Sequence, residues 1–114
     1  LSLGSMAPMA VPSPFLGLAD LLDRADPAGG MERPARMAAL LAMTYGSAEA
    51  SGMLGFTGGL AVGAWADFIL VDVDPTTAMP DELRRARVSH VWVGGQLVWE
   101  AKDAAPAAPS PDQR

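Results

Sequence analysis

The chain has 114 residues, half of them hydrophobic and 18% charged, with a formal net charge of −5 and no Cys. This length allows one small domain, and the composition is too apolar for a disordered chain. The acidic balance argues against nucleic-acid binding, no apolar run reaches the roughly 18 residues of a membrane span, and disulfide or thiolate chemistry is excluded.

The first part of the chain predicts a short strand, a loop and a helix. Residues 1–3 form the strand, which Gly4 and Ser5 end, and the prolines up to Pro14 predict an irregular loop. Residues 14–26 form the helix, because Ser13 suits an N-cap and a proline is tolerated at the first helical position.

A second helix is predicted over residues 34–45, followed by a further helical turn within residues 47–53. Its apolar spacing places one face of the second helix against the core, and Gly46 breaks or caps it. The residues of that expected face are Met37, Leu40, Leu41 and Thr44. Met residues at helical spacing indicate core filling rather than a metal-binding group.

A glycine-rich stretch then leads into the clearest apolar run of the chain. Phe68–Val71 is apolar without interruption, which indicates a strand covered on both faces, although a short run alone also fits a helix. Flanking Gly63 and the Asp-x-Asp-Pro exit at residues 72–75 favour the strand. Asp67 is either a general base or ligand, or a structural group that accepts backbone N–H bonds at the strand entry. We favour the structural interpretation, because no His or second acid lies near it in sequence.

The C-terminal part predicts a helical turn, a hairpin and a tail. Residues 80–86 carry acids first and arginines last, as a helix dipole prefers. Residues 88–99 alternate around Gly94 and Gly95 as a hairpin does. His90 is the only histidine, and a lone histidine in a strand indicates an amphipathic side chain rather than a metal site.

Three of these segments together resemble a known family. Residues 58–75 read Gly-Gly-Leu-x-Val-Gly-x-x-Ala-Asp-Phe-Ile-Leu-Val-Asp-x-Asp-Pro, which is similar to the C-terminal signature of metal-dependent amidohydrolases, with Ala64 where the family has Lys. Residues 88–99 resemble the family's closing hairpin, and residues 3–8 resemble the end of its last barrel strand, Gly-Ser-Asp-x-Pro. The closest subgroup is amidohydrolase family 3, and the resemblance spans about residues 1–100.

The resemblance implies an α/β fragment: the last strand and helices of a TIM-barrel-type amidohydrolase, followed by a small, mainly β portion of a β-sandwich. Residues 1–57 would end the barrel domain, residues 58–101 would belong to the composite sandwich, and residues 102–114 would be a disordered Ala/Pro-rich tail. A complete barrel needs about 250 residues, so this chain is expected to be part of a larger enzyme.

The resemblance also assigns roles to particular positions. Met6 stands where the family has its catalytic Asp, so no catalytic residue and no metal ligand is expected in this chain. Ser5 and Pro8 would lie in a loop on the substrate side. The full-length parent would use a divalent metal, zinc above all. The residues expected to form the structural motif are Gly58, Gly63, Ala66, Asp67, Asp72, Gly94 and Gly95.

The function that follows is that of a hydrolase acting on C–N bonds other than peptide bonds through metal-activated water, the isolated chain being inactive. The alternatives are a non-catalytic structural or interaction module, and a degenerate amidohydrolase that lacks the catalytic Asp. The expected partners are the rest of the barrel and the N-terminal strands of the sandwich, or a second copy of the chain, with no nucleic acid and no membrane. No basic segment precedes the first apolar residues, so no signal peptide is visible and a cytoplasmic location is expected.

Overall fold

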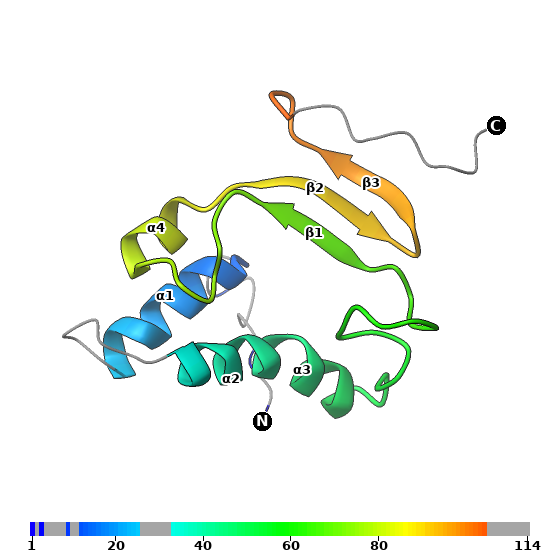
Figure 1. Cartoon of the computed structure of the whole chain (residues 1–114), viewed down its shortest axis with the longest axis horizontal. Helices are drawn as coiled ribbons and strands as arrows, with labels where there is room; N and C mark the ends of the chain where they lie inside the picture. Colours follow the sequence, from blue (N-terminus) through cyan, green and yellow to red (C-terminus); the bar gives the residue numbers. More distant parts are fainter. Residues whose placement is uncertain (2, 4–8, 10–11, 26–32, 105–114) are drawn as a thin grey trace.

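The computed structural model describes residues 1, 3, 9, 12–25 and 33–104, which form helices and one three-stranded antiparallel sheet (Figure 1). The sheet stands to one side of the helices. Within the described segments, no helix is long and apolar enough to cross a membrane. In chain order the elements are α1 (Pro14–Ala25), α2 (Arg33–Met43), α3 (Tyr45–Ala50), β1 (Phe68–Val71), α4 (Pro80–Arg85), β2 (Val88–Val93) and β3 (Gln96–Glu100).

The hydrophobic core lies among α1, α2 and α4 rather than beneath the sheet. Leu18 and Leu22 of α1 and Leu83 of α4 are its largest fully buried side chains. Ala19, Ala39 and Ala78 complete it, and several half-buried side chains pack around it: Phe15, Leu21, Leu40, Met43 and Val73. The sheet is therefore joined to this core mainly through the connections on either side of α4.

Helix α1 begins as the sequence predicts. The backbone N–H of Leu16 donates to Ser13 Oγ at 3.4 Å, which satisfies one of the N–H groups that the first turn leaves without a partner. Pro14 occupies the first helical position, where it costs no hydrogen bond.

The face that α2 presents to the core differs from the prediction. Met37 and Leu41 are about half exposed, whereas Arg36, Ala39 and Ala42 are buried. The small alanines allow close packing, and the Arg36 guanidinium donates to the carbonyl oxygen of Ala78, which lies 42 residues along the chain. A long-range contact thus decides the orientation of the helix, and apolar spacing alone does not reveal it.

Leu1 and Leu3 lie beside the break between α2 and α3, and neither of these two described residues is in a strand, contrary to the prediction. The Leu3 N–H donates to the Ala42 carbonyl at 3.1 Å, and the Ser47 hydroxyl lies 3.2 Å from the same oxygen and 3.3 Å from the Leu3 carbonyl. The helix breaks at Thr44. Gly46 lies inside α3, where a Cβ would come within 1.9 Å of the Leu1 carbonyl oxygen.

The sheet has the order β1-β2-β3, with β2 in the centre. Phe68 pairs with Trp92 and Leu70 with His90, while on the other side of β2 His90 pairs with Glu100 and Trp92 with Leu97. The hairpin turns through Gly94 and Gly95, both with positive φ (57° and 78°), which is the signature of a type I′ turn. The predicted hairpin is confirmed.

β1 is an edge strand, and its exposure corrects one expectation. Ile69 and Leu70 are 42% and 48% exposed, so both faces are not covered within the described chain. The reason is that the helical core lies beside α4, and β2 is the only strand paired with β1 in the described sheet. After β3 the chain forms a turn at residues 101–104; residues 105–114 of the expected tail lie outside the described residues.

Candidate functional site

The residues of the glycine-rich motif meet at the start of β1. Asp67 Oδ1 accepts the backbone N–H of Gly94 at 2.7 Å, and its Oδ2 accepts the hydroxyl of Thr57 at 3.1 Å. Next to it, the Ala66 carbonyl accepts the Gly95 N–H at 2.9 Å. Ala66 and Asp67 therefore bind both amides of the hairpin turn, and Asp67 also ties this turn to the loop that follows α3.

The other end of β1 is held in a similar way. Asp72 Oδ1 accepts the Arg87 N–H at 2.8 Å, and the Asp72 N–H donates to the Arg87 carbonyl at 3.2 Å. Asp74 Oδ1 accepts both the backbone N–H and the hydroxyl of Thr76, at 2.8 and 2.7 Å, which makes an Asx turn. Asp67 and Asp72 thus flank β1. Asp67 accepts a backbone amide just after the end of β2, and Asp72 accepts one just before its start.

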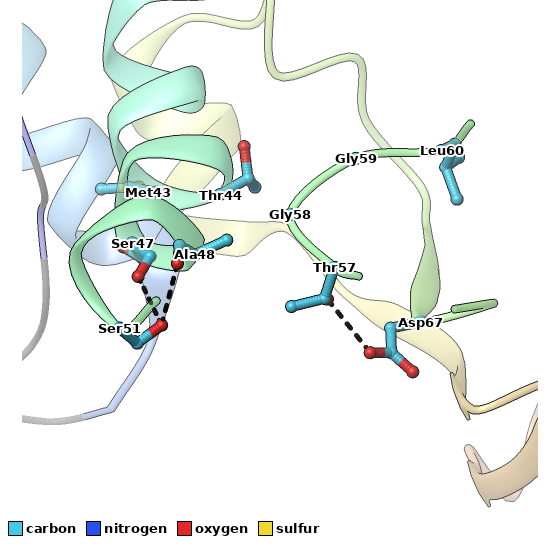
Figure 2. A pocket seen from close by; sticks show the side chains of 10 residues that line it. All are labelled: Met43, Thr44, Ser47, Ala48, Ser51, Thr57, Gly58, Gly59, Leu60 and Asp67. Atoms are coloured by element: carbon cyan, nitrogen blue, oxygen red, sulfur yellow. Dashed lines mark hydrogen bonds between the residues drawn. The ribbon is translucent and has the colours of Figure 1, made fainter. Parts of the chain in front are cut away.

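A shallow cavity of about 460 Å³ opens between α2, α3 and the loop at residues 57–60 (Figure 2). Several of its lining hydroxyl groups donate to helix carbonyls. Ser51 Oγ lies 2.8 Å from the Ser47 carbonyl and 3.2 Å from the Ala48 carbonyl, and Thr44 Oγ1 lies 3.0 Å from the Leu40 carbonyl. Figure 2 shows Thr57 pointing to Asp67, away from α3. The Ser51 and Thr44 hydroxyls thus donate to backbone carbonyls, which cannot serve as the base that a hydroxyl nucleophile needs, whereas Thr57 donates to the carboxylate of Asp67.

Gly58 makes the closest approach between this loop and the helices. Its φ is +91°, and a Cβ there would lie 2.7 Å from the Ala48 Cβ and 3.2 Å from the Thr44 carbonyl oxygen. Gly63 shares the same φ, but a Cβ there would meet no atom within 4 Å. The two motif glycines therefore differ: both set the backbone direction, and Gly58 alone of the two also makes room for α3.

The residues that the sequence places on the substrate side, Ser5, Met6 and Pro8, lie outside the described residues. The described residues do not fit a catalytic metal, because they contain no group of three or more His, Cys, Asp or Glu side chains that could hold one. His90 is buried in β2, with the carboxylate of Glu100 beside it.

Three residues make contacts that the sequence did not reveal: Thr57 at the site, and Arg36 and Arg84 among the helices. No feature of the sequence predicts that Thr57 contacts Asp67, which lies ten residues further along the chain. Likewise, nothing in the sequence predicts that Arg36 contacts Ala78. Arg84 of α4 reaches α1, with ion-pair distances of 2.5 Å to Asp23 and 3.0 Å to Asp20. The hydrogen bond to Asp23, and to a smaller extent the one to Asp20, raises the pKa of Arg84 above its ordinary value. Two acids one helical turn apart on α1 were the available signal for a cation partner.

Comparison with protein families identifies a match over nearly the whole chain. The model of the amidohydrolase family, amidohydrolase family 3, matches residues 1–99. No curated protein and no solved structure matches the chain.

Proposed function

Because the chain belongs to the amidohydrolase family over residues 1–99, we propose that it is part of a hydrolase that acts on C–N bonds other than peptide bonds. The match over nearly the whole chain is the observation that carries this proposal. At the level of the family, the function is that of a hydrolase.

The proposed contribution of this chain is support. The signature residues Ala66, Asp67 and Asp72 bind backbone amides at both ends of β2, and the lining hydroxyl groups donate to helix carbonyls. In this proposal residues 1–57 end a TIM-barrel domain, residues 58–101 contribute to a β-sandwich, and the remaining strands of both are the partners.

The catalytic metal, for which we propose zinc, would be bound by other residues of the full enzyme, because the described residues do not fit it. We therefore assign no step of the hydrolysis to a described side chain. If Met6 also stands at the catalytic Asp position in the full-length enzyme, that enzyme would be a degenerate member of the family.

Metal analysis and activity assays of the purified chain test this division of labour. We expect substoichiometric zinc after dialysis against zinc, and no hydrolysis of amides or cyclic amides. Stoichiometric zinc that is lost on His90→Ala, or turnover by the chain alone, would overturn the proposal that this chain only supports the site.

The coding sequence upstream of Leu1 tests the proposal that the chain is part of a larger hydrolase. A His-x-His strand encoded in frame there supports the hydrolase or its degenerate form. A stop codon directly before Leu1 would instead support a non-catalytic structural or interaction module.

A further inference from the structure

The single histidine of the chain occupies an unusual place for a titratable group. His90 lies on the central strand β2 with its side chain 4% exposed. Its ring stacks on Trp92 at a centroid distance of 5.2 Å, and Trp92 stacks in turn on Phe68 of β1 at 4.7 Å. The aromatic stack fixes the plane of the imidazole, and so it fixes the directions in which the two ring nitrogens point.

Those directions lead to polar groups that bridge all three strands. Nδ1 of His90 lies 3.0 Å from Ser89 Oγ, and this hydroxyl oxygen lies 3.5 Å from the Leu70 carbonyl of β1. On the other side, Nε2 lies 3.3 Å from Oε1 of Glu100 on β3, at ion-pair distance but without the geometry of a hydrogen bond. Contacts thus run from β1 through Ser89 and His90 of β2 to β3.

The serine has one hydrogen to donate, and the tautomer and the charge of His90 together decide where it goes. With a neutral imidazole protonated at Nε2, Ser89 donates to Nδ1, and the Leu70 carbonyl receives nothing from it. With a second proton on Nδ1, His90 donates to Ser89 Oγ, so the serine hydrogen turns to the Leu70 carbonyl. The same proton, taken from solvent, makes the contact with Glu100 a charged pair.

We propose that Leu70, Ser89, His90 and Glu100 form a proton-dependent clasp across the three strands. Relative to the neutral ring protonated at Nε2, the clasp is stronger with the second proton bound, because it gains a hydrogen bond to β1 and an ion pair to β3. The carboxylate of Glu100, which is 41% exposed, lies beside the buried ring. Leu70 faces His90 from β1 without charge. Further charged residues at this end of the sheet are Asp72, Arg87, Lys102 and Asp103, of which Arg87 and Asp103 lie 3.9 Å from each other.

Hydrogen exchange of the whole chain, followed by mass spectrometry at low concentration, tests the clasp. Protection factors, corrected for the intrinsic pH dependence of exchange, are compared for β3 at about pH 8 and about pH 5, the limits between which histidine titrates. We expect protection of β3 to rise about threefold at the lower pH, the size of effect that a partly exposed ion pair gives.

Two variants test the contact with β3 and the contact with β1 separately. Glu100→Gln should abolish the rise in β3, and Ser89→Ala should abolish the smaller rise in β1. Glu49→Gln removes the same charge from an exposed position on α3 and should leave both intact. In the wild-type chain, imidazole 15N resonances of the one histidine report protonation independently of any variant. A His90 that gains its proton while protection of β3 stays constant, or a full rise in Glu100→Gln, would overturn the clasp.

Discussion

At the scale of single residues, Asp67 joins more of the structure than any other residue of the signature. It links a hydroxyl ten residues before it to a backbone amide 27 residues after it. The sequence left two interpretations open, a general base or a structural acceptor, because a carboxylate serves both. The described geometry occupies both of its oxygens with donors from the protein, which leads to the first prediction.

Replacing Asp67 by Ala should lower the free energy of unfolding by about 1–3 kcal/mol, because the Gly94 amide and the Thr57 hydroxyl would both lose their acceptor. Thr57→Val removes only one of the two bonds, so we expect a smaller loss of about 1 kcal/mol. Chemical denaturation measures both values.

The matched control for this pair is Asp103→Ala. Asp103 is 80% exposed, and its carboxylate lies 3.9 Å from Arg87, so its loss should change stability by no more than about 0.5 kcal/mol. If Asp67→Ala were as neutral as this control, the carboxylate would not stabilise the contact between the hairpin turn and the loop after α3. A chemical role for Asp67 would then be favoured over the structural one.

At the scale of elements, the contact between the hairpin turn and the loop after α3 depends on how closely that loop approaches α3. Gly58→Ala should destabilise the chain for two reasons: a positive φ that a Cβ disfavours, and a contact of 2.7 Å with Ala48. The φ alone costs about 1 kcal/mol, and the overpacking costs about 1–3 kcal/mol more. Thermal melts report the total.

Substitutions at two nearby glycines distinguish the cost of the positive φ from the cost of the close contact. Gly63→Ala has the same φ of +91° but open space, so it should show the cost of φ alone, while Gly59→Ala has neither and should be close to neutral. Equal effects at Gly58 and Gly63 would mean that the loop moves away from α3 at little cost.

Elements with a strong local signal were predictable, and those set by distant contacts were not. The start of α1 is determined by two adjacent residues, Ser13 and Pro14. The hairpin turn is likewise determined by Gly94 and Gly95. The buried face of α2 depends on Arg36 reaching Ala78, and the exposure of β1 depends on which elements cover it. The motif residues around Asp67 could be identified as a group, but Thr57 could not, because its contact exists only once the loop has folded.

At the scale of the whole molecule, the apolar residues are divided unequally between a buried helical core and an open sheet. Leu18, Leu22 and Leu83 are fully buried, whereas Val93, Val98 and Trp99 are 49–56% exposed. In the described sheet, β1 and β3 each have one edge with no strand paired to it. Open edges can pair with other strands, and large exposed apolar patches mark interaction or aggregation sites.

We therefore predict that the isolated chain self-associates. Light scattering should show a mass that grows with concentration, because burial of exposed Val, Leu and Trp side chains favours contact between copies despite the net charge of −5. Val98→Lys places a charge on the edge strand β3 and should reduce this growth. Leu41→Lys adds the same charge at a half-exposed position on α2 and should not. A sharply melting monomer at high concentration would contradict the prediction. It would mean that the three strands need no further partner, and the chain would then stand closer to an independent module than to one part of a larger hydrolase.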